Sequence, residues 1–147
     1  MRVAEKRRVQ ASRALVWDLV TDPRRWPEFM DGLVVSEVVG DEATGLGARW
    51  AVRLQVGAAA LGGTVEVVEF HPPGDLAWNG VTGIGMRGRW RLRERSAGVT
   101  DVELRLSYQA PGGLTGAIAD RVAAPAVQRR LRRSLCGLAG LVEAPRR

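Results

Sequence analysis

The chain has 147 residues, a length that indicates one domain over residues 1–147. A domain of this size buries roughly 68–70% of its unfolded surface, so it needs neither disulfide bonds nor a structural metal to fold. It contains one cysteine, which excludes an internal disulfide bond and suits a reducing compartment. No window approaches the roughly 18 apolar residues of a membrane span, and the N-terminus does not look like a signal peptide. We therefore expect a soluble, cytoplasmic protein that is a monomer or a homodimer.

The net charge of +6 has two explanations. An excess of basic residues can indicate binding to nucleic acid or to anionic lipid. It can also reflect a GC-rich genome, because every basic residue except Lys6 is Arg and the chain contains 18 Gly. The charges are spread over the predicted strands and helix without an aromatic-and-basic surface motif. Nucleic acid is therefore not the partner that we expect.

The N-terminal part of the chain predicts a strand followed by two short helices. Residues 2–10 are polar enough for a strand near the edge of a sheet. Ser12 is a good N-cap for a helix over residues 14–20, which has one apolar side. A second helical segment over residues 24–30 is limited to a turn or two by Pro27.

The middle of the chain predicts six strands, because apolar and polar residues alternate there as in half-buried strands. These strands are expected over residues 33–39, 48–56, 64–70, 76–79, 84–93 and 100–108. The last two should pair across the turn at residues 96–98, since the Arg residues of one face the acidic residues of the other. Residues 57–63 are expected to be a loose connection and residues 80–85 a glycine-rich hairpin. Together with residues 111–113 they could form an entrance.

Residues 113–142 predict one long helix, because apolar residues recur at spacings of three and four. Pro125 is expected to kink or briefly interrupt this helix. Its polar side carries Arg121, Arg129, Arg130, Arg132 and Arg133. So long an apolar stripe requires cover, and the strands can supply it. We therefore predict an α+β fold in which a curved antiparallel sheet of about seven strands wraps around the C-terminal helix.

Two segments of the chain resemble a known family. The residues VWDLVTDP at 16–23, followed by RWPEF at 25–29, resemble the opening of START-like (SRPBCC) proteins. The residues VEFHPP at 68–73, followed by LAW at 76–78, resemble a second segment of the polyketide cyclase/dehydrase and lipid-transport group of that superfamily. His71 stands where the group usually has an acidic residue, which we interpret as a local difference in a turn. The resemblance covers essentially the whole chain and implies a helix-grip fold with a hydrophobic cavity between sheet and helix.

The predicted lining of this cavity is rich in tryptophan. It consists of Trp26, Phe29, Trp50, Leu54, Trp78, Met86, Trp90, Leu106, Tyr108, Ile118 and Val122. The alternative is that these side chains fill one another's space, which is the commoner role of a single aromatic residue in a strand. Five Trp in a chain with two Phe and one Tyr favour some open space for the set as a whole. Gly88, on the same predicted face, should leave room.

The sequence contains no recognisable catalytic motif, metal-ligand spacing or cofactor fingerprint, so we predict no catalytic residue, no metal and no cofactor. The polar groups expected to reach the cavity are Tyr108, Asn79 and an indole N–H of Trp50 or Trp90. None of them is a general base. Cys136 is expected to be a small core or boundary residue.

Three functional hypotheses follow. The first is a binding or carrier module for a small hydrophobic ligand, which could be a lipid, a polyketide, an isoprenoid or an aromatic compound. The second is a polyketide cyclase or aromatase. The third is an interaction protein whose basic helix face binds RNA, the ribosome or anionic lipid.

Overall fold

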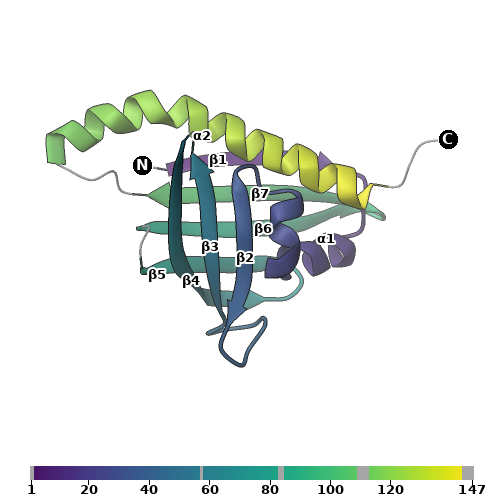
Figure 1. The fold of residues 1–147 in the computed structure, drawn as a ribbon. Coiled ribbons are helices and arrows are strands. Elements are labelled where there is room, and N and C mark those ends of the chain that lie inside the picture. The colour runs from purple at the N-terminus through teal and green to yellow at the C-terminus, as the bar shows by residue number, and fades with distance from the viewer. Residues whose placement is uncertain (1, 57, 83–84, 109–112, 144–147) are drawn as a thin grey trace.

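The computed structural model describes residues 2–56, 58–82, 85–108 and 113–143. The elements follow the order β1 (Arg2–Val9), α1 (Arg13–Val20), η1 (Pro23–Glu28), β2 (Leu33–Val39), β3 (Arg49–Val56), β4 (Ala59–His71), β5 (Asp75–Thr82), β6 (Met86–Ser96), β7 (Val99–Tyr108) and α2 (Gly113–Val142). Seven strands form one sheet, which curls beneath the long helix α2 (Figure 1). The α+β helix-grip fold predicted from the sequence is confirmed.

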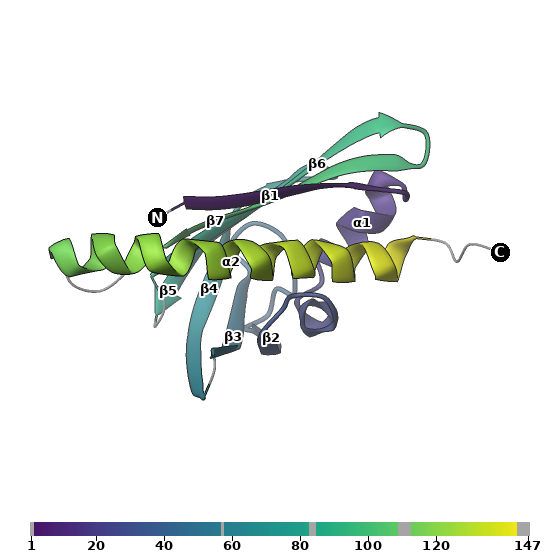
Figure 2. The same cartoon turned by 90° about the horizontal axis from the view of Figure 1, so that it is seen from above.

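The sheet is antiparallel throughout, in the order β1-β7-β6-β5-β4-β3-β2. The first strand lies at one edge, as its polar sequence predicted, and β2 lies at the other. Viewed from above, α2 runs along β1 (Figure 2). The short helices α1 and η1 lie at one end of the sheet, near the C-terminal end of α2 (Figure 1).

Local side-chain hydrogen bonds define the two short helices. The Ser12 hydroxyl accepts the N–H of Leu15 at 3.2 Å and caps α1, as the sequence predicted. Asp22 accepts the N–H of Arg24 at 3.1 Å and caps η1, in which Pro23 occupies the first turn. The segment is a 3-10 helix of six residues.

One predicted connection is part of a strand. Residues 57–63 were expected to be loose, but β4 begins at Ala59, and its pairing with β3 extends from Val56 opposite Ala59 to Val52 opposite Gly63. The hydrogen bonds between β3 and β4 are made by backbone groups, so the small side chains of this segment do not prevent the pairing. The glycine-rich turn predicted over residues 80–85 is also shorter than expected, because β5 continues to Thr82. Residues 83, 84, 111 and 112 of the predicted entrance lie outside the described part of the chain.

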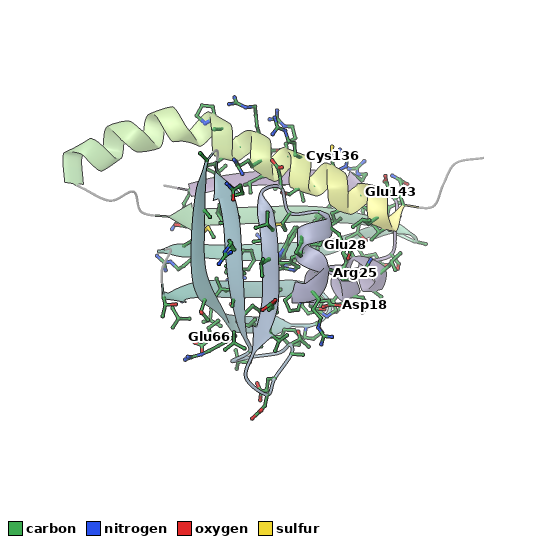
Figure 3. The ribbon with its side chains drawn as sticks, viewed as in Figure 1. Asp18, Arg25, Glu28, Glu66, Cys136 and Glu143 are labelled. Carbon is green, nitrogen blue, oxygen red and sulfur yellow. The ribbon has the colours of Figure 1, made fainter. Side chains whose placement is uncertain are left out.

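The helix α2 continues through Pro125 without the interruption that we considered, and it arches as it crosses the sheet (Figure 1). Cys136, expected at or near the core, is exposed on α2 (Figure 3). Its neighbours Leu135 and Leu138 occupy the apolar stripe instead, and both are fully buried. A guanidinium nitrogen of Arg7 donates to the Cys136 sulfur at 3.3 Å.

The C-terminal half of α2 and Glu143, the residue after the helix, are bonded to the edge strand β1 and to Gln10, the residue after that strand. The side-chain amide of Gln128 donates to the main-chain carbonyl of Ala4 at 2.6 Å. The N–H of Gln10 donates to the carboxylate of Glu143 at 2.8 Å. These bonds use backbone groups along an edge that has no further strand.

The same half of α2 is also bonded to the segment between η1 and β2. The N–H of Asp31 donates to the hydroxyl of Ser134 at 2.9 Å, and a guanidinium nitrogen of Arg133 lies 3.4 Å from the Asp31 carboxylate. A side chain at Gly137 would place its Cβ 3.2 Å from the carbonyl oxygen of Phe29, so the helix lies against that backbone. One half of α2 therefore bridges from β1 to the segment that leads into β2.

The outer face of the sheet carries the charge pairs predicted for β6 and β7. Arg91 stands opposite Glu103 in the register, with charged atoms 3.8 Å apart. Glu103 also lies 2.7 Å from Arg105 and 3.6 Å from Lys6, and only 10% of its side chain is exposed. The carboxylate lies against the sheet beneath its cations.

A second cluster on this face centres on Asp75 of β5, which lies 3.1 Å from Arg93, 3.7 Å from Arg89 and 3.9 Å from Arg91. Arg89 also forms an ion pair with Glu69. The side-chain hydrogen bond from Arg89 lowers the pKa of the Glu69 carboxyl below its ordinary value, against a smaller opposing effect of desolvation. The same bond raises the pKa of Arg89.

This pairing predicts an acid-sensitive contribution to stability. Because the pKa of Glu69 is lowered on folding, the pair stabilises the fold above the ordinary carboxyl pKa and stops doing so as pH falls through the lowered value. Glu69→Gln should cost about 0.2–1 kcal/mol of unfolding free energy near neutral pH, since both side chains are one-third exposed. Urea unfolding at several pH values measures this. A difference between variant and wild type that does not shrink in acid would contradict the assignment.

Candidate ligand site on the inner face of the sheet

Three of the predicted site residues, all tryptophans, form one cluster on the inner face. The ring of Trp26, on η1, lies 5.1 Å from the rings of Trp50 on β3 and Trp78 on β5, edge-on to both. The indole N–H of Trp26 donates to the carbonyl of Val20 at 2.9 Å, and that of Trp50 to the carbonyl of Ala43 at 2.9 Å. All three rings are buried, and they pack against one another.

The space over Gly88 is filled by Trp78. Gly88 on β6 stands directly opposite Trp78 in the register, and a methyl group at position 88 would overlap the indole ring. The expectation that Gly88 leaves room is therefore wrong: the glycine accommodates an indole of the neighbouring strand. The sequence could have indicated this, because a glycine within an alternating strand often marks such a close approach.

Burial along the inner face changes from one end of the sheet to the other. Trp90 and Leu104, opposite each other on β6 and β7, are both fully buried. Two residues nearer the start of β6 and the end of β7, Leu106 is only partly buried, and so are Met86 and Leu54. The strands are antiparallel, so the end of β3, the start of β6 and the end of β7 share one end of the sheet. The inner face is packed at the end near η1 and less covered at the other.

Three of the predicted lining residues, Tyr108, Ile118 and Val122, are placed only by their backbone. Tyr108 pairs with Met86 at the less covered end, and Ile118 and Val122 belong to the N-terminal half of α2. Their side chains lie outside the part of the chain that the structure describes. Phe29 is buried with its ring 6.0 Å from that of Trp90.

Two buried polar groups on the inner face have no hydrogen-bond partner in the described parts of the chain. They are the indole nitrogen of Trp90 and the hydroxyl of Ser36 on β2. Ser36 was missed by the sequence analysis, although a serine in the inward phase of a Val-rich strand is a usable signal. Such unsatisfied groups are rare in folded proteins, and each calls for an explanation.

Asn79 does not point toward the cavity. It stands opposite Arg87 on one side and Glu66 on the other, on the outer face of the sheet. Its neighbour Trp78 faces inward, and successive residues of a strand face opposite sides. The prediction that Asn79 would contact a ligand inside the fold is therefore wrong.

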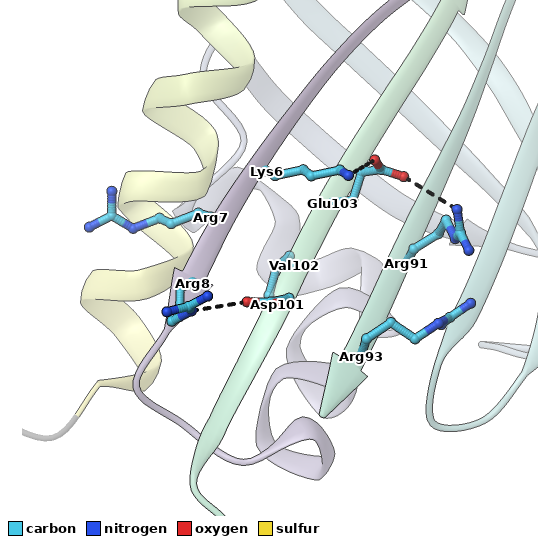
Figure 4. A pocket seen from close by; sticks show the side chains of 8 residues that line it. All are labelled: Lys6, Arg7, Arg8, Arg91, Arg93, Asp101, Val102 and Glu103. Atoms are coloured by element: carbon cyan, nitrogen blue, oxygen red, sulfur yellow. Dashed lines mark hydrogen bonds and ion pairs between the residues drawn. The ribbon is translucent and has the colours of Figure 1, made fainter. Parts of the chain in front are cut away.

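The outer face has a hollow of about 450 Å³ near β1, β6 and β7 (Figure 4). It is lined by Lys6, Arg7, Arg8, Arg91, Arg93, Asp101, Val102 and Glu103. Arg8 lies 3.3 Å from Asp101, and the other carboxylate, Glu103, is covered by cations. Five basic residues and two carboxylates line the hollow. Lys6, Arg8, Arg91 and Arg93 each already pair with the carboxylate of Glu103, Asp101 or Asp75, so the hollow does not resemble a site built for an anion.

The basic face of α2 is partly engaged with the rest of the chain. Arg132 lies 3.2 Å from Glu5 on β1, and Arg130 donates to the carbonyl of Gln55 at 3.4 Å. Arg129 is exposed. Across residues 2–56, 58–82, 85–108 and 113–143, no group of three His, Cys, Asp or Glu is placed to hold a metal ion. In the same residues no helix is long and apolar enough to cross a membrane.

Comparison with known families decides the affiliation. The family described as polyketide cyclase/dehydrase and lipid transport matches residues 1–143. The chain belongs to this family. No curated protein sequence matches the chain significantly.

Several solved structures share the fold of this chain. The protein TTHA0849 from Thermus thermophilus is 19% identical with a TM-score of 0.82, and the match covers 95% of each chain. The Zhui aromatase/cyclase from Streptomyces sp. R1128 is 20% identical with a TM-score of 0.78, over 96% of this chain and 92% of that one. The di-domain aromatase/cyclase StfQ of the steffimycin biosynthetic pathway is 20% identical with a TM-score of 0.69, over 95% of this chain and 44% of that one. At these identities the likeness concerns the fold.

The residues that carried the family resemblance in the sequence have structural roles. Asp22 caps η1, and the indole N–H of Trp26 donates to the carbonyl of Val20 at the end of α1. Trp17 packs against Phe70 with ring centroids 5.3 Å apart. The peptide bond between Pro72 and Pro73 is cis. The family signature in this chain thus specifies how the short helices and the sheet fit together.

The contact between Trp78 and Gly88 predicts a large effect of a small substitution. Gly88→Ala should lower the unfolding free energy by about 1–3 kcal/mol, since the added methyl group has no space beside the indole ring. Gly62→Ala on β4 is the matched control, because its Cβ would meet only a carbonyl oxygen at 3.7 Å. Urea unfolding of both variants measures the difference. Equal stability of the two would show that the indole does not occupy this space.

Proposed function

We propose that the chain binds a small, largely apolar ligand at the less covered end of the inner face, between the sheet and the N-terminal half of α2. The observation that carries this proposal is the partial burial of Leu54, Met86 and Leu106, which face inward but are not enclosed as Trp90 and Leu104 are. Membership of the polyketide cyclase/dehydrase and lipid transport family supports it. The ligand classes compatible with this surface are lipids, polyketides, isoprenoids and aromatic compounds.

Apolar burial supplies the affinity in this proposal. A ligand that removed roughly 200 Å² of apolar surface from water would gain about 5 kcal/mol before the cost of immobilisation. Leu54, Met86 and Leu106 supply apolar surface for this contact. The tryptophan cluster forms the base of this site, where Trp26 contacts the rings of Trp50 and Trp78, and where the indoles of Trp26 and Trp50 are hydrogen-bonded to the main chain.

The first experiment is native mass spectrometry of the purified chain, followed by extraction and identification of whatever co-purifies. We expect a bound apolar compound, or binding of 9-fluorenone as a rigid apolar probe in equilibrium dialysis. A mass without ligand, together with no binding of 9-fluorenone or of any fatty acid in a panel, would overturn the proposal.

Filling the site should block it without unfolding the chain. Leu106→Trp is expected to weaken the affinity for 9-fluorenone at least about tenfold, because the larger ring occupies the space that the probe needs. Val68→Trp is the control, since Val68 is exposed on β4 with 41% of its surface accessible. Both variants are checked for folding by circular dichroism. Equal affinity of the two variants would show that Leu106 does not line the site.

The second candidate is a cyclase or aromatase, which the names of two structural relatives support. Tyr108 is the residue that would orient or stabilise an enolate in such a reaction, because it ends β7 beside Met86. On a polyketide-like substrate, Tyr108→Phe should abolish turnover and keep affinity if the chain is an enzyme. A parallel loss of both would favour a carrier.

A further inference from the structure

The indole N–H of Trp90 is the group from which we infer the polarity of the ligand, an inference that rests on the proposed function. We infer that this N–H donates a hydrogen bond to an uncharged oxygen acceptor at the leading end of the bound molecule. The ligand class is then an apolar compound with a buried carbonyl, hydroxyl or ether oxygen. A pure hydrocarbon, or a simple acyl chain that enters tail-first, has no oxygen at its leading end and would leave the Trp90 N–H without an acceptor.

Trp90 differs from the other inner-face tryptophans whose hydrogen bonds are defined. Trp26 and Trp50 each donate to a main-chain carbonyl at 2.9 Å. Trp90 is fully buried, and its nitrogen has no partner in the described part of the chain. A buried donor without a partner costs about 1–3 kcal/mol, and indole can only donate. A binding partner for this group must therefore present an acceptor.

Trp90 lies one inward row deeper than Leu106, the partly buried residue of the proposed site on β7. Its register partners are Leu76 on β5 and Leu104 on β7, both fully buried. The next inward row toward the less covered end consists of Trp78, Gly88 and Leu106. The buried ring of Trp78 lies over Gly88, and Leu106 is partly buried. Two residues along a strand correspond to about 7 Å. Trp90 thus belongs to the first fully enclosed row below the partly covered one.

The nitrogen of Trp90 is covered in the free chain, so a ligand reaches it only when neighbouring side chains shift. One of these side chains is Trp78, whose ring lies over Gly88 between Trp90 and the less covered end. Another is Phe29, with its ring 6.0 Å from that of Trp90 and inclined by 64°. The hydrogen bond that the Trp90 N–H gains from the ligand then offsets part of the free-energy cost of moving these side chains. An uncharged oxygen is expected because burying a charge costs far more than one hydrogen bond returns.

The test uses two probes of nearly the same shape, 9-fluorenone and fluorene, which differ by one carbonyl group. Affinities are measured by equilibrium dialysis for the wild type, Trp90→Phe and Trp50→Phe. The compared quantity is the ratio of ketone to hydrocarbon affinity, which cancels the general hydrophobicity of each probe. We expect this ratio to fall about tenfold in Trp90→Phe, which keeps an aromatic ring and removes the N–H. The ratio should stay unchanged in Trp50→Phe, because the N–H removed there donates to the carbonyl of Ala43 and not to the ligand.

A nuclear magnetic resonance titration provides a second measurement. It is made on the wild-type protein, so its result does not depend on the stability of a variant. The indole ¹⁵N–¹H signal of Trp90, assigned from its absence in Trp90→Phe or from backbone connectivity, should move downfield with 9-fluorenone and not with fluorene. Binding of both probes with an unchanged ratio and no selective shift would overturn this inference and leave the proposed function intact. Binding of neither probe would overturn both.

Discussion

The C-terminal half of α2 holds the fold in its curled shape, because it is bonded to both sides of the sheet at once. On one side Gln128 of the helix and Glu143, directly after it, bond to backbone groups of β1 and of Gln10. On the other the helix lies against the backbone of Phe29 and binds Asp31 through Ser134. A flat sheet could not meet one helix at both places. The inner face, the tryptophan cluster and the closed end of the site all depend on this bridge.

The inner face consequently has two parts with different properties. Near η1 the rings of Trp26, Trp50 and Trp78 fill the curl, and Trp78 uses the missing side chain of Gly88 to do so. At the far end the inward residues are only partly covered. The family signature lies mainly in the packed part, which explains why family membership determines the architecture more closely than the ligand.

Periodicity in the sequence predicted the order and type of nearly every element, since alternation and three-to-four spacing reflect local burial. The pairing of β6 with β7 followed from the matched charges of their outer faces, and the cap of α1 followed from Ser12. Periodicity missed the start of β4, because pairing there depends on backbone groups that no side-chain pattern reports. It misjudged Gly88 and Asn79, since the contents of a curled sheet depend on which strands become neighbours and in what register. The orphaned donor of Trp90 likewise emerges only when the partners of every indole are known.

The outer ion pairs give this surface an uneven mutational tolerance. Each of the carboxylates Asp75 and Glu103 is shared among three cations, which lie outside it and shield it. Loss of one arginine leaves two other basic residues to neutralise the same carboxylate, so substitution of a single arginine should change the stability little. Loss of either carboxylate leaves several guanidinium or ammonium groups facing one another. Over evolutionary time the few acidic positions of this face should therefore change more slowly than the many basic ones around them.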